Sequence, residues 1–251
     1  MKIALTFDVE RDIPNLLDTT FGVKVGLIKI IKVLDKYDIN GTFFCTGNVA
    51  ERLPEYIRIL EQKGHEIACH GLNHERFYQL NFKKCHHLIY QNKKILERIC
   101  QDSKILGFRA PYLRTPKFLF KVLNTLNFKY DSSIRSPRML PVDHTNSPVQ
   151  EFHPSSFNAL LRLPLSYSMF RNRIFKKKLI ILCLHPWEAI DMKSVVLGNI
   201  HDMDLFNRIV FRPDRFVNTG ENFIARLCKF IEDSLLVKAE FIMLKQLLNN
   251  S

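Results

Sequence analysis

Two pairs of side chains in the sequence have the types and the spacing that metal-assisted chemistry requires. His70 and His74 stand four positions apart in the stretch IACHGLNHERF, and Asp8 and Glu10 stand two positions apart in LTFDVE. Residues two apart on a flat strand point to the same side, so both carboxylates can face one site. Two histidines and one carboxylate can hold a catalytic zinc-type ion and leave a position open for water. On spacing alone, the two histidines are equally compatible with a polar pair on one face of a helix.

Further polar side chains extend this set toward a hydrolase. Arg109 follows the apolar segment ILGF, and His185 follows LIILCL. A bound divalent ion lowers the pKa of water toward ~7. A second carboxylate can then act as general base, and a third histidine can protonate the leaving group. An arginine beside the carboxylate would keep it ionised and oriented. Together these groups predict the hydrolysis of an amide or an ester.

The segments that carry these residues alternate between strand-like and helix-like patterns. The expected strands are residues 2–9, 40–47, 65–71, 105–112, 129–134, 178–187 and the first part of 239–248, and the expected helices are 25–39, 54–64, 81–100, 116–128 and 220–237. Repeated strand–helix units predict a mostly parallel α/β sheet or barrel in one domain, residues 1–251. The polar residues stand where strands end, which is where functional groups gather in α/β folds. Residues 135–178 are rich in proline and are expected to form a loop-rich insertion that borders the site.

The composition is that of a globular protein. Of 251 residues, 46% are hydrophobic and 25% are charged, which allows a sizeable core. No apolar run approaches the ~20 residues that cross a bilayer, and the N-terminal MKIALTFDVE lacks the long apolar region of a secretory signal. A cytoplasmic location is therefore expected. The six cysteines form no C-x-x-C pair and are expected to be free, buried thiols.

The net charge of +12 and the pI near 9.5 raise the question of polyanionic partners. The densest basic segment is 162–178, which contains Arg162, Arg171, Arg173 and Lys176 to Lys178. No nucleic-acid-binding motif accompanies it, so nucleic acid is not expected as a partner. A solvated basic face is the favoured interpretation, and contact with a membrane surface or with a phosphate-bearing substrate is the second.

Six segments, in order, resemble the successive motifs of the polysaccharide deacetylases (NodB-type proteins, carbohydrate esterase family 4). They are LTFDVE, GTFFCTGNVAERLPE, KGHEIACHGLNH, GFRAPY, YDSSI and IILCLHPWE. The later segment FRPDRFVNTGENFIARLCKFIED resembles the helix that closes these domains, so the resemblance covers nearly the whole chain. It implies a distorted (β/α) barrel and the metal-dependent removal of N-acetyl groups from sugars.

The resemblance implies a role for each matching residue at the centre of the site. Asp8 matches the catalytic base, and Arg109 matches the arginine that holds this base. His70 and His74 match the two metal-binding histidines, and His185 matches the catalytic acid.

Other matches concern the support and the rim of the site. Asp131 falls in the motif whose acidic residue supports the catalytic histidine, and the backbone N–H of Tyr112 would lie where the oxyanion forms. The tryptophan often found after YDSSI is missing, and Trp187 is expected to line the substrate pocket. Taken singly, Asp131 could form a structural ion pair with Arg109, and Trp187 could pack in the core.

The first motif departs from the usual Thr-Phe-Asp-Asp of the family. Val9 occupies the place of the second aspartate, which binds the metal in the family, and valine cannot bind a metal. Because some branches carry Asp-x-Glu, Glu10 is the expected metal carboxylate beside His70 and His74. Two alternatives stay open: Asp8 binds the metal itself, or only the two histidines do.

The leading hypothesis is a metal-dependent deacetylase that uses one divalent ion, zinc or else cobalt, nickel or manganese. Its expected substrate is an N-acetylated sugar or glycan precursor, which a lipid or a phosphate linker could carry. The second hypothesis is hydrolysis of another non-peptide C–N bond, as in the cyclic amide hydrolases of the family. The third is a metal-free glycan-binding domain, which Val9 motivates.

Overall fold

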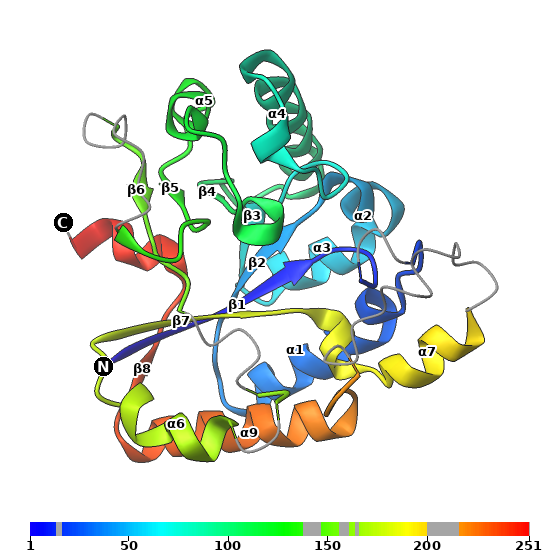
Figure 1. The fold of residues 1–251 in the computed structure, drawn as a ribbon, viewed down its shortest axis with the longest axis vertical. Coiled ribbons are helices and arrows are strands. Elements are labelled where there is room, and N and C mark those ends of the chain that lie inside the picture. The colour runs from blue at the N-terminus through cyan, green and yellow to red at the C-terminus, as the bar shows by residue number, and fades with distance from the viewer. Residues whose placement is uncertain (14–16, 138–146, 156–160, 164–165, 200–215, 251) are drawn as a thin grey trace.

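One curled sheet of parallel strands positions the candidate residues in the computed structural model, which describes residues 1–13, 17–137, 147–155, 161–163, 166–199 and 216–250. The strands are β1 (Lys2–Val9), β2 (Thr42–Cys45), β3 (Glu66–Cys69), β4 (Gly107–Phe108), β5 (Tyr130–Asp131), β6 (Gln150–Glu151), β7 (Leu179–Leu184) and β8 (Glu240–Phe241). Their order is β6-β5-β4-β3-β2-β1-β7, with β8 beside the start of β1 (Figure 1).

The strand β1 lies between β2 and β7 and is buried along most of its length. A strand covered on both faces is expected to be as apolar as KIALTFDV. One set of its side chains packs in the large core cluster under the helices: Ile3, Leu5, Phe7 and Val9. Ala4 faces the inside of the curl, where it packs in a smaller cluster with Phe44. Because side chains alternate, Asp8 shares this inner face with Ala4.

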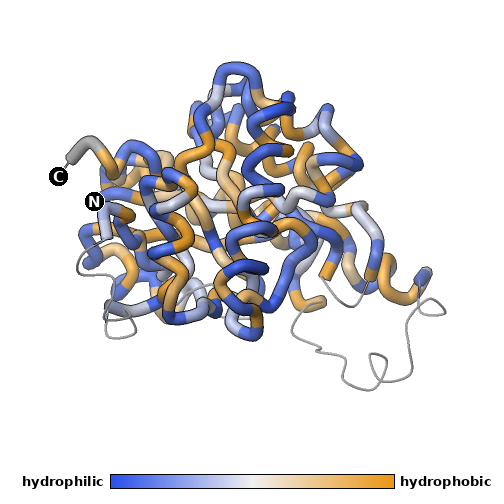
Figure 2. Tube along the Cα trace, turned by 90° about the horizontal axis from the view of Figure 1, so that it is seen from above, coloured by the Kyte–Doolittle hydropathy of each residue, from blue (hydrophilic) through white to orange (hydrophobic). Residues whose placement is uncertain are grey.

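Helices cover the outside of the curled sheet (Figure 1). They are α1 (Leu27–Lys36), α2 (Gly47–Arg52), α3 (Pro54–Gln62), α4 (Phe82–Ile99), α5 (Leu119–Thr125), α6 (Ser166–Ile174), α7 (Met192–Gly198) and α9 (Glu221–Leu236). Asn81 caps α4 by accepting a hydrogen bond from the Lys84 N–H, and Pro54 begins α3. Hydrophobic and hydrophilic segments alternate along the helical turns (Figure 2), so an apolar face can pack on the sheet.

The two edge strands of the sheet, β6 and β7, are connected by hydrogen bonds just after β6. The Ser155 N–H donates to the Ile181 carbonyl oxygen at 2.9 Å, and the Ile181 N–H donates to Ser155 Oγ at 3.1 Å. Ser155 follows β6, whereas Ile181 lies in β7, so these bonds connect the two edges of the sheet. The curl is therefore a distorted barrel, and the expected (β/α) fold class is confirmed.

Some elements have no counterpart among the expected ones. The helix α2 follows β2 where the sequence predicts only a turn, and β6 and α6 lie within the segment 135–178. Tertiary contacts stabilise α6, because Tyr167 donates a hydrogen bond to Asp233 of α9 at 2.7 Å and packs on Phe230. Residues 138–146, 156–160 and 164–165, for which a loop is expected, lie outside the described residues.

Two expectations from composition can be compared with the structure. All six cysteines are free, and all except Cys228 are buried, as expected. Within the described ranges, no helix combines the length and the apolar character that a membrane span needs. The single-domain organisation and the cytoplasmic location stay predictions.

Candidate metal centre

Glu10, His70 and His74 bring their ligand atoms together beyond the carboxyl ends of β1 and β3. Glu10 Oε2 lies 2.9 Å from His74 Nε2 and 3.3 Å from His70 Nε2. The three ligand atoms lie within 4.8 Å of one another, and all three residues are buried. Although these distances are short, Glu10 Oε2 has no hydrogen-bond partner of acceptable geometry among the described residues. One buried carboxylate and two imidazoles that converge in this way fit a divalent ion.

The alternation of β1 explains why the expected carboxylate is displaced by one position. Val9 is fully buried in the core cluster under the helices, whereas Asp8 and Glu10 face the histidines. A carboxylate at position 9 would point into this apolar core. Asp8 Oδ2 lies 3.9 Å from His70 Nε2, so the geometry favours Glu10 over Asp8 as the third ligand.

A tight loop, not a helix, carries the two histidines. Gly71 and His74 both have positive φ angles, 78° and 62°. A Cβ at Gly71 would lie 2.7 Å from Glu75 Oε2 and 2.9 Å from the Phe77 ring, so only glycine fits without displacement. The Glu75 carboxylate accepts hydrogen bonds from two backbone N–H groups of the loop, at 3.0 and 2.8 Å. The interpretation of the spacing as one helical face is therefore wrong.

The backbone just after β4 orients His70. His70 Nδ1 lies 2.9 Å from the carbonyl oxygen of Arg109, an acceptor that directs the ring proton to Nδ1 and leaves the Nε2 lone pair toward the site. Burial opposes the ionisation of Glu10, but His74 and His70 outweigh it and hold the pKa of Glu10 well below its ordinary value. Metal binding requires an ionised carboxylate and unprotonated ligand nitrogens, so a bound ion would replace the histidine protons that lower this pKa.

Asp8 and Arg109 form a buried ion pair beside this centre. Arg109 Nη1 donates to Asp8 Oδ1 at 2.8 Å and to Thr6 Oγ1 at 2.7 Å. Arg109 Nε donates to the Ser132 carbonyl oxygen at 3.0 Å, and the guanidinium lies 4.0 Å from the centre of the Phe44 ring. Burial alone would raise the pKa of Asp8, but Arg109 and the nearby histidines outweigh it and lower this pKa. Asp8 is therefore ionised and held in one orientation.

His185 faces both carboxylates from the end of β7. Its Nε2 lies 3.8 Å from Glu10 Oε1 and 3.9 Å from Asp8 Oδ2. Its ring stacks on Trp187 with 5.0 Å between centroids. Trp187 is only 5% exposed and packs in an apolar cluster with Ile190. The structure therefore supports the core-packing alternative for Trp187 over a place in the lining of a substrate pocket.

Tyr112 borders the metal centre from a turn after β4. Its ring lies 4.5 Å from the His74 ring, and the residue is 37% exposed. Its φ of 62° is unusual for a bulky residue, and strained turns of this kind cluster at functional sites. The part of its N–H in stabilising an oxyanion stays a prediction.

Asp131 does not contact His185, although the family pattern implies that it supports this histidine. Because side chains alternate along β5, Tyr130 packs inside the barrel and Asp131 points the other way. Ser133 Oγ donates to Asp131 Oδ1 at 2.6 Å, and the Ala110 N–H donates to Ser133 Oγ at 2.7 Å. Among the described residues, no hydrogen bond or ion pair joins Asp131 to His185. Asp131 instead anchors the backbone that leads to Tyr112.

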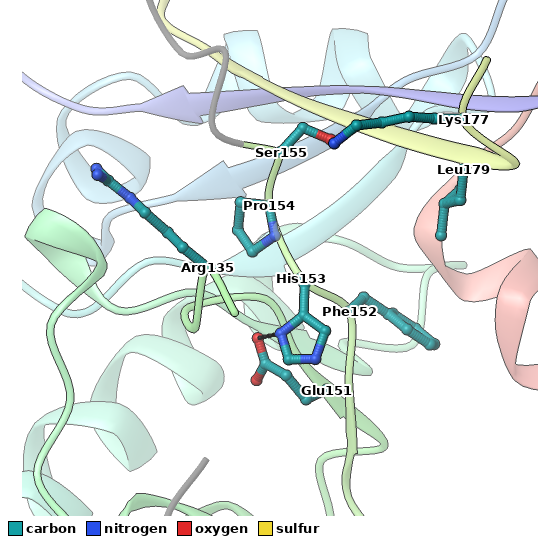
Figure 3. A pocket seen from close by; sticks show the side chains of 8 residues that line it. All are labelled: Arg135, Glu151, Phe152, His153, Pro154, Ser155, Lys177 and Leu179. Carbon is teal, nitrogen blue, oxygen red and sulfur yellow. Dashed lines mark ion pairs between the residues drawn. The ribbon is translucent and has the colours of Figure 1, made fainter. Parts of the chain in front are cut away.

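The carboxyl group of Glu151 on β6 is the neighbour of Asp131. Burial and the proximity of the two groups raise the pKa of Glu151, and burial raises that of Asp131. Glu151 and His153 line a pocket with a volume of about 300 Å³. Figure 3 shows their side chains next to each other, and His153 Nδ1 lies 3.9 Å from Glu151 Oε1. His153 donates from Nδ1 to the Ile134 carbonyl oxygen at 2.6 Å. This histidine belongs to the wall beside β6 and not to the metal centre.

Sequence reasoning missed two residues beside His185. Glu188, in the short helix η6 (Pro186–Ala189), accepts a hydrogen bond from the His185 N–H at 3.0 Å, and its other oxygen pairs with Arg162 Nε. Arg162 is only 7% exposed, so it does not belong to the solvated basic face expected for 162–178. The motif HPWE contains a signal for Glu188, because an acid three residues after a helix-capping position often returns to it.

Comparison with known proteins places these residues in a family. A family model described as polysaccharide deacetylase matches residues 1–130. A peptidoglycan deacetylase of Helicobacter pylori is 25% identical over 114 residues, which are 45% of this chain and 39% of that protein. A chitooligosaccharide deacetylase of Sinorhizobium fredii is 26% identical over 111 residues, which are 44% of this chain and 46% of that protein. The matches thus span less than half the length of these curated relatives.

Solved structures share the barrel. A Mycobacterium smegmatis protein assigned as a polysaccharide deacetylase has a TM-score of 0.76 at 21% identity, over 99% of this chain and 89% of that one. An allantoinase has a TM-score of 0.72 at 15% identity, over 99% and 89%. A CE4 family pseudoenzyme from Bacillus anthracis has a TM-score of 0.63 at 13% identity, over 98% and 65%. Since one fold here accompanies different activities, these likenesses show the fold alone.

The match to the family model decides the relationship. It covers 130 of the 251 residues, and this range contains Asp8, Glu10, His70, His74 and Arg109. The chain belongs to the polysaccharide deacetylase family.

Proposed function

We propose that the chain is a metal-dependent hydrolase that removes the acetyl group from an N-acetylated sugar or glycan precursor. The observation that carries the proposal is the buried cluster of Glu10, His70 and His74 directly beside the Asp8–Arg109 ion pair. The deacetylase names of the relatives support an amide bond on a sugar as the target.

Glu10, His70 and His74 would hold one divalent ion. Two imidazoles and a carboxylate suit zinc first, with cobalt, nickel and manganese as alternatives. When bound, the ion supplies Lewis-acid chemistry, polarising the amide carbonyl and making water more acidic. The buried Arg109 carbonyl oxygen fixes one of these ligands by holding His70 Nδ1 at 2.9 Å.

In the proposed reaction, Asp8 and His185 move the two protons. Asp8 Oδ1 is held by Arg109, while Oδ2 lies 3.9 Å from His185 Nε2. As an ionised carboxylate, Asp8 can take a proton from the attacking water. His185 Nε2 can deliver a proton to the amine nitrogen as the C–N bond breaks. The products are acetate and a free amino sugar.

The experiment combines metal analysis with a panel of N-acetylated sugars and oligosaccharides. We expect about one divalent ion per chain and acetate release that a chelator abolishes. The variants His70→Ala and His74→Ala should lose both, whereas His87→Ala, at an exposed position on α4, should retain both. No acetate release across the panel with metal supplied would rule out the deacetylase. Cyclic amides in the same panel test the alternative C–N hydrolase, and glycan binding by a metal-free protein would favour the binding domain.

The second part of the proposal is that an anionic group, a diphosphate linker or a membrane lipid, carries the sugar substrate. Arg173 is exposed in the last turn of α6, and Lys176 to Lys178 are exposed just after this helix. Such a basic cluster attracts an anionic linker or a membrane surface. We expect diphosphate-linked substrates to be cleaved faster than free ones at low salt, and the difference to vanish at high salt. Replacement of Lys176 and Lys178 by serine should reduce this preference without changing the rate on free sugars. Equal rates on both substrates at low salt would contradict the anionic carrier.

A further inference from the structure

The His185 ring has one nitrogen that the proposed reaction leaves unexplained. Nε2 faces Asp8 and Glu10, whereas Nδ1 is buried and has no hydrogen-bond partner in the described part of the chain. A histidine that gives a proton from Nε2 is protonated on both nitrogens beforehand, so the Nδ1 proton also needs an acceptor. Glu188 Oε2 lies 3.9 Å from Nδ1. Hydrogen bonds of catalytic groups are often long before the substrate binds.

Glu188 is fixed by contacts on both of its oxygens. Oε2 accepts a hydrogen bond from the backbone N–H of His185 at 3.0 Å, and Oε1 pairs with Arg162 Nε. The side chain of Glu188 is 1% exposed and that of Arg162 is 9% exposed. A buried, doubly held carboxylate can turn little, so it stays on the Nδ1 side of the ring.

The same arginine also supports the other face of the turn. The Arg162 guanidinium lies 5.2 Å from the Trp187 ring, which stacks on the His185 ring at 5.0 Å with 29° between the planes. Gly26, just before α1, lies so close to the turn that an added Cβ would stand 2.0 Å from the Pro186 carbonyl oxygen. The turn after β7 is therefore enclosed between the Arg162 guanidinium on one side and the N-terminus of α1 on the other.

We propose that Glu188, held by Arg162, is the positioning residue of His185: it accepts the Nδ1 proton and so presents Nε2 as the proton donor. The inference rests on the proposed deacetylase function. It moves the supporting role from Asp131, which points away from His185, to a carboxylate on the same turn. In the reaction, the Nε2 proton passes to the amine nitrogen, and the Nδ1 proton remains between His185 and Glu188.

Glu188 could instead act only as the structural cap of η6, and a variant that keeps the cap but loses the charge separates this role from the positioning of His185. In Glu188→Gln the side-chain oxygen can still accept from the His185 N–H, but the charge is lost. This change leaves Arg162 without its buried partner and costs stability. The double variant Arg162→Met/Glu188→Gln removes both charges at similar volume, so it keeps the fold testable. Asp233→Asn is the matched control, because Asp233 of α9 is a buried carboxylate that pairs with Arg171 of α6.

The experiment measures kcat and KM for acetate release, together with ¹⁵N spectra of the metal-loaded, histidine-labelled protein. The His185 signals are identified by their absence in His185→Gln. We expect the wild-type protein to carry a hydrogen-bonded proton on Nδ1. In Glu188→Gln and in the double variant, kcat should fall by about 10- to 100-fold with little change in KM, and the Nδ1 signal should shift. Glu188→Asp should recover part of kcat, and Asp233→Asn should match the wild type in kcat and in the spectrum.

Two results would overturn the proposal: wild-type kcat in the double variant, or an Nδ1 signal that Glu188→Gln leaves unchanged. The spectrum does not depend on the substrate, so it separates this proposal from the proposed function. An Nδ1 signal that shifts in Glu188→Gln, in a wild-type protein that releases no acetate from any substrate, would support the positioning and contradict the deacetylase.

Discussion

Glu10 Oε2 lies 2.9 Å from His74 Nε2, although the two residues come from different loops of the barrel. This contact places the proposed metal carboxylate one residue beyond the position that the family usually uses. It follows from the pleat of β1, in which Val9 faces the core and its neighbours face the histidines. The loss of one aspartate is thus compatible with a complete set of three ligands.

Val9→Asp restores the usual family residue but should not restore a ligand. We expect the free energy of unfolding to fall by about 3 kcal/mol, because the new carboxylate would be buried without a partner. Metal affinity should not rise. Urea unfolding and zinc titration measure the two quantities. The control Val9→Ile keeps an apolar side chain, so it should leave the zinc affinity unchanged and lower the free energy of unfolding by about 1 kcal/mol, the low end for one added methylene. Tighter metal binding in Val9→Asp at unchanged stability would show that position 9 faces the site.

Gly71→Ala should distort the loop that carries His74. The added Cβ would meet Glu75 and Phe77 at less than 3 Å, on a backbone with φ of 78°. We expect a loss of about 1–3 kcal/mol in stability and a weaker affinity for zinc, measured by thermal unfolding and by competition with a chelator. Gly198→Ala is the control, because no heavy atom lies within 4 Å of its added Cβ. Unaltered zinc affinity in Gly71→Ala would mean that this glycine does not set the position of His74.

The sequence predicted that Glu10, His70 and His74 lie close together, because this grouping depends only on where strands end. His70 follows β3, Glu10 follows β1 and His185 follows β7, and the ends of parallel strands gather at one side of a barrel. The alternation within a strand also indicated that Asp8 and Glu10 share a face.

The remaining features depend on contacts that a single segment does not encode. Asp131 and Tyr130 are neighbours on a two-residue strand, and only the packed barrel determines which of them faces inward. The pairing of Arg162 with Glu188 joins two segments across a region without a regular pattern. The nine residues of α6 lack a clear apolar stripe, and Tyr167 stabilises the helix through its contacts with α9.

Arg109→Lys should separate the orientation of Asp8 from metal binding. Lysine keeps a positive charge but cannot reproduce the forked hydrogen bonds to Asp8 and Ser132. We expect kcat for acetate release to fall by about 10²-fold, while the zinc content stays the same. Arg98→Lys is the control, since Arg98 forms an exposed ion pair with Glu51. Wild-type kcat in Arg109→Lys would show that any buried cation suffices beside Asp8.

His65 should make the fold sensitive to acid. The residue is 2% exposed, and burial lowers its pKa from 6.5 to about 4. The folded protein therefore resists protonation that the unfolded chain accepts, so this contribution to stability is present above pH 6.5 and is lost as the pH falls toward 4. At about 1.4 kcal/mol per pH unit, the loss reaches about 3 kcal/mol. Between pH 7.5 and 4.5, the free energy of unfolding should fall by about 2.5 kcal/mol more in the wild type than in His65→Gln. An equal fall in both proteins would contradict the assignment.

The most direct test of the account is a crystal structure of the zinc-loaded protein with anomalous diffraction at the zinc edge. We expect one ion, at about 2.0–2.2 Å from a Glu10 carboxylate oxygen and from Nε2 of His70 and His74, with Asp8 still paired to Arg109. An ion bound by Asp8 in place of Glu10, or no anomalous peak beside the two histidines, would contradict it.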